Sequence, residues 1–351
     1  MKIVFVVPDM AGGGTERVIS LLANEYVNRG IDTAILSFAG NQQAYPLDEG
    51  VELISAGGAS GGSFKIRLER LKAMRRYFKN NKGCYIFSFS TIGTGFVVLS
   101  TLFMKRNMLV SERTDPRSCD HKTYRDFFYR FCRTLVCQTQ DAVDSFPDYL
   151  KKKACVVGNP IDPAIPDIYE GIRRKAICAV GRLEPVKNFE MLIEAFSIFI
   201  TVHPDYILEI YGRGSLEEEL KRFVREKHLE KQIIFQGFCP DVKEKIRDAS
   251  MFVLSSNYEG ISNSMIEALA MGIPVIATDC PIGGSRTYIK NGKNGILVPV
   301  GNEKKMAKAM RDITEDQEFS ERCRKEAENI RHSCSIEKIA DKLLKIADKC
   351  I

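Results

Sequence analysis

The sequence of 351 residues lacks the features that mark several classes of protein. No apolar run approaches the ~18 residues needed to span a bilayer, so we predict no transmembrane helix. The eleven cysteines include no C-x-x-C pair, which argues against a metal site of that spacing. Their odd number, with no secretory leader before them, argues against a disulfide framework. We therefore expect reduced thiols in a cytoplasmic protein.

Positive charge is concentrated in the first half of the chain. Residues 1–160 carry 22 basic and 15 acidic side chains, whereas the remaining residues carry 29 and 30, for a net charge of +6 overall. A basic half beside a nearly neutral one indicates that one domain faces an anionic partner.

Short apolar runs alternate with amphipathic helical segments in both halves of the chain. This alternation is typical of parallel strands joined by helical crossovers. It begins again at Ala176–Val180, after the proline-rich segment Gly158–Tyr169. We therefore predict an α/β protein of two doubly wound, Rossmann-like domains, residues 1–165 and 166–351, facing each other across a central cleft. The charged C-terminal helix is a candidate to cross back to the first domain. The predicted strands are Ile3–Val7, Thr33–Ser37, Val51–Ile54, Tyr85–Phe89, Met108–Ser111, Leu135–Gln138, Ala154–Val157, Ala176–Val180, Ile207–Tyr211, Ile233–Phe235, Met251–Leu254 and Pro274–Thr278.

Three glycines follow the first predicted strand. Gly12, Gly13 and Gly14 stand between that strand and a helix predicted to begin near Arg17. Exposed backbone amides and a helix N-terminus favour an anion at such a place. The segment lacks the G-x-G-x-x-G pattern and no acidic residue ends the second strand, so a dinucleotide-binding dehydrogenase is disfavoured. A plain tight turn explains the glycines equally well.

Two cations follow the first strand of the second half. Arg182 can engage two phosphate oxygens at once, and Lys187 adds a point charge five residues later. Together they could neutralise a leaving diphosphate, a task that a metal performs in other enzymes. A solvated loop with unrelated charges is the alternative for either residue taken singly.

The most specific pattern follows the strand predicted at Met251–Leu254. Glu259 precedes a predicted helix and Glu267 lies about one turn inside it, with Gly260–Asn263 between them. Amides at such a helix start bind phosphate or sugar oxygens. The two carboxylates can accept hydrogen bonds from sugar or ribose hydroxyls. A single glutamate early in a helix would indicate only a favourable interaction with the helix dipole.

At these residues the chain resembles the retaining glycosyltransferases of family 4, which have the GT-B fold. The resemblance extends over nearly the whole chain. Each motif alone is too short to identify the family, so the resemblance rests on the full set of motifs in their order along the chain. The motifs are similar to those of bacterial enzymes that build capsule, exopolysaccharide or lipid-linked oligosaccharide. They are Gly13–Arg17, Ser111–Pro116, Asn159–Asp162, Gly181–Lys187, Tyr211–Gly214, Gln236–Phe238, Glu259–Ala277 and Asn291–Gly295.

The resemblance implies a nucleotide-sugar site in the second domain and an acceptor site in the first. Arg182 and Lys187 would hold the diphosphate of a donor, commonly a UDP sugar, while Glu267 would bind the ribose and Glu259 the transferred sugar. No metal and no other cofactor is implied. The remaining donor contacts would come from Gly13 and Gly14 of the first domain, and from Gly212, Arg213, Phe238, Gly260, Ile261, Ser262 and Asn263 of the second.

The first domain departs from the family pattern in one respect. Many members place a histidine near the transferred sugar, but the only histidine of that half is His121, which we expect on the surface. Arg113, within the motif Ser111–Pro116, is the candidate to touch the sugar or acceptor instead. Because no protein nucleophile emerges, we expect front-face substitution, in which the donor phosphate helps to deprotonate the acceptor.

Basic segments of the first half are candidates for the acceptor side. Phe64–Lys82 carries eight cations and one acidic residue, and Tyr124–Arg133 mixes arginines with aromatic residues. They indicate either a solvent-exposed outer face of the domain or a surface that contacts anionic lipid or a polyprenyl diphosphate. No nucleic-acid motif accompanies them. The acceptor and membrane candidates are Glu16, Arg67, Arg70, Arg75 and Arg125.

The sequence favours an enzyme that moves a hexose or N-acetylhexosamine to a lipid-linked or polysaccharide acceptor, at the inner face of the cytoplasmic membrane for a lipid-linked one. One alternative is a nucleotide-sugar epimerase, which needs no acceptor, or a disaccharide phosphorylase, which needs inorganic phosphate. A second alternative is an idle sugar-nucleotide-binding partner of an active transferase. The joint presence of Arg182, Lys187, Glu259 and Glu267 argues against an idle site.

Overall fold

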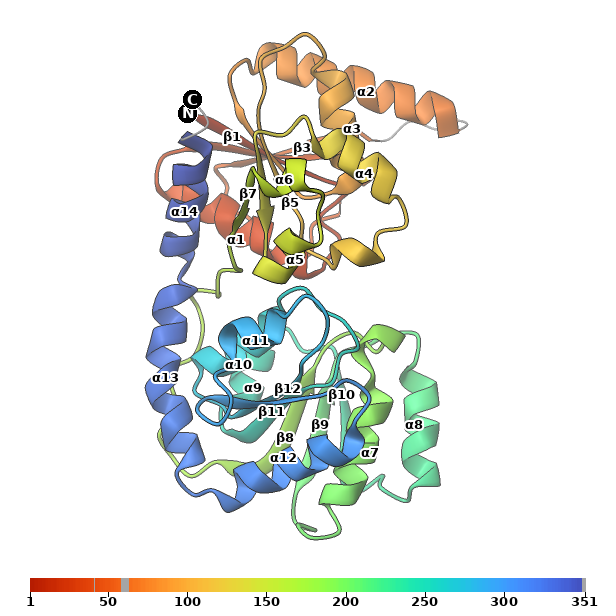
Figure 1. Cartoon of the computed structure of the whole chain (residues 1–351), viewed down its shortest axis with the longest axis vertical. Helices are drawn as coiled ribbons and strands as arrows, with labels where there is room; N and C mark the ends of the chain where they lie inside the picture. The colour runs from red at the N-terminus through yellow and green to blue at the C-terminus, as the bar shows by residue number, and fades with distance from the viewer. Residues whose placement is uncertain (41, 58–62, 349–351) are drawn as a thin grey trace. The chain divides into compact units, whose positions relative to one another are not determined.

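The computed structural model describes residues 1–40, 42–57 and 63–348, which form two compact units (Figure 1). Unit 1 comprises Met1–Pro160 and Ser335–Ile351, and unit 2 comprises Ile161–Cys334. The chain therefore changes unit a few residues before the predicted boundary near residue 165, and it returns to unit 1 for its last helix. Within the described residues, no helix is long and apolar enough to cross a membrane.

Unit 1 is built on a parallel sheet of seven strands in the order β3-β2-β1-β4-β5-β6-β7. β1 is buried from Ile3 to Val7, as expected of a central strand covered on both faces. Helix α14 packs beside α1, where Tyr26 Oη donates to Ala340 O at 3.3 Å. The strands are β1 (Lys2–Val7), β2 (Asp32–Ser37), β3 (Val51–Ser55), β4 (Tyr85–Ser88), β5 (Asn107–Ser111), β6 (Thr134–Cys137) and β7 (Ala154–Val156). The helices are α1 (Gly14–Asn28), α2 (Ser63–Asn80), α3 (Thr91–Ser100), α4 (Lys122–Tyr129), α5 (Gln140–Asp144), α6 (Asp148–Lys151) and α14 (Ile336–Asp348), with a 3-10 turn at Pro116–Ser118.

Unit 2 is built on a parallel sheet of six strands in the order β10-β9-β8-β11-β12-β13. Apolar side chains of α7, α8 and α12 form one core cluster with the sheet, and those of α10 form another. The strands are β8 (Arg174–Val180), β9 (Ile207–Tyr211), β10 (Ile233–Gly237), β11 (Ala249–Leu254), β12 (Val275–Thr278) and β13 (Gly295–Val298). The helices are α7 (Phe189–Phe199), α8 (Glu217–Glu226), α9 (Val242–Ile246), α10 (Asn263–Ala270), α11 (Gly284–Tyr288), α12 (Glu303–Glu315) and α13 (Phe319–Ser333), with a 3-10 turn at Pro185–Lys187.

Each sheet has one point at which the order of its strands reverses. In unit 1 the chain adds β2 and β3 on one side of β1 and then β4 to β7 on the other. In unit 2 the reversal lies between β8 and β11. Parallel sheets bind ligands beyond the carboxyl ends of the strands at such switch points, so the loops after β1, β4, β8 and β11 are the first places to look for a site.

Candidate functional site

Two loops of unit 2 are joined by an ion pair at its switch point. Lys187 lies after β8 and Glu259 lies after β11, and the Lys187 ammonium donates a hydrogen bond to the Glu259 carboxylate. Ser256 Oγ donates to the same carboxylate oxygen at 3.2 Å. The two charged side chains are 16% and 17% exposed. The groups predicted to contact donor phosphate and donor sugar therefore lie within bonding distance of each other.

The backbone around Lys187 is fixed by neighbouring hydrogen bonds. Asn257 N, in the loop after β11, donates to Val186 O at 2.8 Å. Asn188 adopts a left-handed backbone with φ of 48°, a conformation that asparagine tolerates better than most residues. Its side chain accepts a hydrogen bond from Met191 N at 3.2 Å and caps α7. Lys187 is therefore held directly before a capped helix.

Gly212 allows a close approach of three loops. Its backbone N donates to Gly237 O at 2.8 Å, and a Cβ at this position would lie 1.9 Å from Gly181 O. Its φ of +141° adds to the cost of any side chain. The loops after β8 and β9 thus meet the end of β10 through backbone atoms. Arg213 and Phe238, both predicted donor contacts, are exposed in the loops after β9 and β10.

Arg182 is an exposed cation in the loop after β8. Its neighbour Glu184 accepts hydrogen bonds from Ser215 N at 3.2 Å and from Ser215 Oγ at 2.9 Å. The hydrogen bond from the Ser215 backbone lowers the pKa of Glu184 most, and the one from the Ser215 hydroxyl lowers it further. The Glu184 carboxylate is thus ionised and bound to the loop after β9.

Helix α10 begins four residues after Glu259. Ser262 is its N-cap residue and accepts a hydrogen bond from Met265 N at 3.4 Å. Glu267, in the second turn, is 4% exposed. The dipole of the helix favours an anion near its first turn. The predicted donor contacts in this segment, Gly260, Ile261, Ser262 and Asn263, lie at and just before the start of the helix.

In unit 1 the glycine-rich loop follows β1 at the switch point. Helix α1 begins at Gly14, with Gly13 as its N-cap residue. A Cβ on Gly13 would lie 2.4 Å from Oε2 of Glu16, so the Glu16 carboxylate folds back over the helix start. Gly12 has a φ of +116°, which an L side chain rarely adopts. The place where an anion was predicted is therefore taken by the Glu16 carboxylate in this structure.

Arg113 is held at the carboxyl edge of the unit 1 sheet. Its Nε donates to Ser111 Oγ at 2.8 Å, and its Nη1 donates to Asn159 Oδ1. Gln138 Nε2 donates to the same Asn159 oxygen at 2.6 Å. The guanidinium lies 5.0 Å from the ring centroid of Phe89. Gln138 was not among the predicted site residues, although a polar residue directly after a buried strand is a signal that could have found it.

Arg125 lies in the core of unit 1, and the prediction that it faces an acceptor or membrane is wrong. It is 2% exposed and donates to Pro116 O. It also pairs with Asp126 at 2.8 Å, and its guanidinium lies 4.5 Å from the ring centroid of Phe146. Arg125 therefore ties α4 to the segment after β5.

Glu112 is the buried neighbour of Arg113. Burial raises the pKa of its carboxyl group, although hydrogen bonds from Thr114 and Tyr129 and the charge of Arg125 act in the opposite direction. Tyr129 Oη donates to it at 3.1 Å, and Thr114 Oγ1 donates at 3.0 Å. These bonds fix the backbone on which Arg113 stands.

The other predicted residues of unit 1 lie on its surface or at the ends of helices. Arg75 of α2 donates to Ser100 O at 3.1 Å and so closes the end of α3. Arg67 is exposed on α2 and Arg70 is half-buried there. His121 is exposed, as expected, and precedes the first residue of α4.

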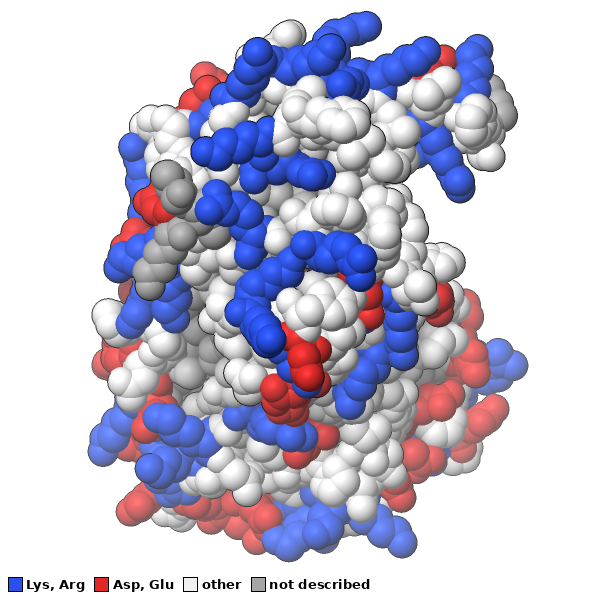
Figure 2. Space-filling view, turned by 45° about the horizontal axis from the view of Figure 1, so that its top comes forward, with Lys and Arg blue, Asp and Glu red and all other residues white. Residues whose placement is uncertain are grey.

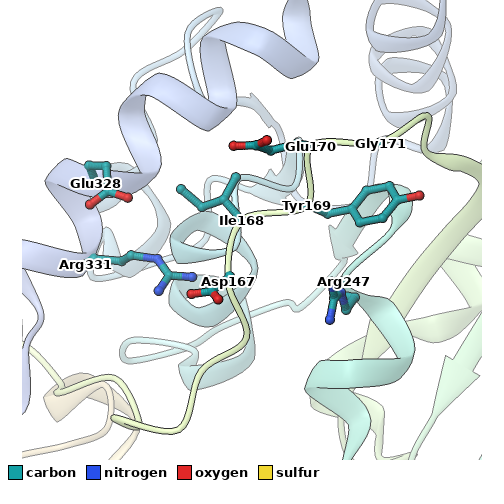
Figure 3. A pocket seen from close by; sticks show the side chains of 8 residues that line it. All are labelled: Asp167, Ile168, Tyr169, Glu170, Gly171, Arg247, Glu328 and Arg331. Atoms are coloured by element: carbon teal, nitrogen blue, oxygen red, sulfur yellow. The ribbon is translucent and has the colours of Figure 1, made fainter.

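A hollow of about 550 Å³ lies elsewhere on unit 2 (Figure 3). The segment Asp167–Gly171 crosses it between α13, which carries Glu328 and Arg331, and Arg247 at the end of α9. Since β11 begins two residues after Arg247, the hollow lies at the amino edge of the sheet, and no predicted donor residue lines it. In the part of the chain that the structure describes, no group of three or more His, Cys, Asp and Glu could hold a metal ion.

The architecture is the GT-B fold of two parallel-sheet, Rossmann-like domains. The structure of Anabaena HepE solved with UDP superposes with a TM-score of 0.83 at 18% identity, covering 99% of this chain and 100% of that one. Residues 169–330 match the model of the family described as glycosyl transferases group 1.

Among the relatives that align with most of the chain are two bacterial glycosyltransferases. The amylovoran biosynthesis glycosyltransferase AmsD of Erwinia amylovora is 28% identical over 302 residues, which cover 80% of this chain and 81% of AmsD. An alpha-1,4-N-acetyl-D-galactosaminyltransferase of Campylobacter jejuni, named for a GalNAc-containing PP-undecaprenol acceptor, is 25% identical over 330 residues, 91% of this chain and 90% of the relative. These matches and the fold support a GT-B glycosyltransferase.

Proposed function

We propose that the protein transfers a hexose or N-acetylhexosamine from a UDP sugar to a lipid-linked or polysaccharide acceptor, with retention and without a metal. The observation that carries the proposal is the Lys187–Glu259 pair at the switch point of unit 2. A cation suited to a diphosphate and a carboxylate suited to sugar hydroxyls lie together there, with Arg182 in the same loop as the lysine. UDP in the HepE structure and the PP-undecaprenol acceptor of the Campylobacter relative support the substrate classes.

On donor binding, the diphosphate would draw the Lys187 ammonium away from Glu259, and the released carboxylate would then accept hydrogen bonds from the donor sugar. The bond between the anomeric carbon and the diphosphate oxygen breaks while the bond to the acceptor oxygen forms on the same face. The acceptor proton passes to a phosphate oxygen of the leaving UDP. Arg182 and Lys187 neutralise the charge that develops there, a role that a metal ion fills in other enzymes.

The test is the melting temperature of the protein with UDP, GDP, ADP and their sugars in the presence of EDTA. A ligand at 100 times its Kd adds about 2.7 kcal/mol of stability, which is a shift of several degrees. We expect UDP and a UDP sugar to produce this shift and Lys187→Ala to abolish it. Lys308→Ala removes an ion-paired lysine from α12 of the same unit and should keep the shift.

Four outcomes would contradict parts of the proposal. No shift with any nucleotide would contradict a transferase, and a full shift in Lys187→Ala would contradict this donor site. With the donor identified, NMR of the product reports the configuration at the anomeric carbon, and inversion would exclude front-face transfer. Loss of turnover in EDTA, restored by Mg²⁺, would contradict metal independence.

A further inference from the structure

Unit 1 exposes large apolar side chains on one set of neighbouring elements. We call this surface the aromatic–basic face; it consists of the exposed side of α2, the end of α3, the turn Thr101–Arg106, the outer side of α4 and Phe131 just after it. Only Met74 and Phe78 of α2 are buried, and both lie in its second half. The exposed apolar residues of this face include Phe64, Leu99, Leu102, Phe103, Phe127 and Phe131.

Side-chain contacts join these elements into one surface. Arg75 of α2 donates to Leu102 O at 3.3 Å, which ties α2 to the turn after α3. The guanidinium of Arg106, in that turn, lies 5.7 Å from the ring centroid of Phe131. The Phe131 ring in turn lies 5.6 Å from that of Phe127 on α4.

Phe103 stands out in this surface because its side chain is fully exposed on a backbone with φ of 66°. A bulky residue rarely adopts this left-handed conformation, which costs free energy without a compensating contact. Leu102 and Leu99 beside it are also exposed. An exposed apolar group of this size marks an interaction site on a folded protein.

The charges around these apolar residues are mostly positive. Residues 63–107 carry ten lysines and arginines and a single acidic residue, Glu69. Figure 2 shows blue side chains with little red over the part of unit 1 that carries α2. Cations that alternate with exposed Phe and Leu side chains suit the interface of an anionic bilayer, where ammonium and guanidinium groups meet phosphates and apolar groups enter the acyl region.

We propose that the aromatic–basic face binds an anionic lipid surface, with Phe103 inserted below the level of the phosphates. Phosphate binding by nucleic acid would use the cations but leave Phe103, Leu102 and Leu99 in water, so the apolar residues favour lipid. The inference goes beyond the transfer reaction and does not depend on the identity of the donor.

A single-tryptophan reporter gives the most direct test, because the chain contains no tryptophan. In Phe103→Trp we expect a blue-shifted emission with phosphatidylcholine vesicles that contain phosphatidylglycerol, and quenching by lipids brominated in the acyl chain. Vesicles of phosphatidylcholine alone should leave the emission unchanged. Ile172→Trp places the reporter on a residue of unit 2 that is 96% exposed, and its emission should not respond to either vesicle.

Sedimentation with the same vesicles measures the contribution of each kind of side chain. Phe103→Asn should weaken binding on the order of tenfold, since it removes one inserted apolar side chain. Asparagine also suits the left-handed backbone, so this variant should fold. Lys72→Glu should weaken binding too, whereas Lys342→Glu makes the same charge change on an exposed residue of α14 and should not.

Binding should fall as salt rises, because it depends on charge. The melting shift with UDP should be the same in all five variants, which separates this surface from the donor site. The proposal would be overturned by equal binding to both vesicles, or by an unchanged emission of Phe103→Trp in protein that sediments with vesicles. It would also be overturned if Lys72→Glu and Lys342→Glu weakened vesicle binding equally. Binding of RNA without binding of vesicles, or self-association through this face alone, would overturn it as well.

Discussion

Lys187 and Glu259 neutralise each other in the structure, although both belong to the set of residues that would contact a bound donor. Removing one partner of such a partly buried pair leaves an uncompensated charge in a site of low exposure. The unliganded stability of Lys187→Ala will therefore differ from that of the wild type. Ligand shifts of each variant need to be measured from its own baseline.

Glu112 predicts a pH dependence of stability. Burial raises the pKa of its carboxyl group in the folded state above the ordinary value of 4.5. Folding therefore favours the protonated form of Glu112. The contribution of this group to the free energy of unfolding is complete below pH 4.5 and is lost as the pH rises through the raised pKa. We expect Glu112→Gln, which stays neutral, to lose less unfolding free energy than the wild type between pH 4.5 and neutrality. Urea unfolding at a series of pH values measures this, and parallel curves would contradict it.

The kinds of residue at the candidate site could be predicted from sequence, because each motif is local and follows a recognisable strand. The contacts that these residues make with one another could not be predicted from sequence. Lys187 and Glu259 are 72 residues apart, and only the pairing of β8 with β11 brings their loops together. Arg125 has the composition of a surface arginine, and its burial depends on Phe146 and Pro116, which the fold alone places beside it.

At the scale of elements, all twelve predicted strands are present, because most of them are short runs rich in apolar residues, as is typical of parallel strands. The sequence pattern does not predict helix α3. Its sequence is apolar on most sides, so it lacks the periodicity that identifies an amphipathic helix, and its clearest signal is the N-cap Ser90, which accepts a hydrogen bond from Gly93 N. β13 is also missing from the predicted strands; it begins at Gly295, and glycine is depleted in strands.

Helix α14 should contribute directly to the stability of unit 1. Leu343 is fully buried in a core cluster shared with α1, so Leu343→Ala should cost about 2–5 kcal/mol of unfolding free energy. Hydrogen exchange should accelerate in α1 and β1 before it accelerates in unit 2. Lys342→Ala, at an exposed position of the same helix, should change stability by about 0.5 kcal/mol or less. Faster exchange confined to unit 2 would contradict this assignment of the helix.

At the scale of the whole molecule, unit 2 is one stretch of chain and unit 1 is two. Ile161 N donates to Cys334 O at 2.8 Å, so the chain enters and leaves unit 2 at adjacent points. Unit 2 also has its own core clusters. We expect the segment Ile161–Cys334 to unfold cooperatively when made alone.

Residues 1–160 alone should lack a cooperative thermal transition, because the core of unit 1 includes side chains of α14. Circular dichroism during heating measures both segments, and adding a peptide of residues 335–348 should restore the transition of the first. A melting curve of residues 1–160 equal to that of unit 1 in the full chain would show that the helix is dispensable.

The adjacent entry and exit of unit 2 also set an order on folding during synthesis. Domains fold as units while the chain leaves the ribosome. The unit that begins first cannot be completed until the last helix has been made, because α14 covers α1. Unit 2, which begins second, has all of its residues by Cys334. During synthesis, unit 2 can therefore fold before the helix that completes the core of unit 1 has been made.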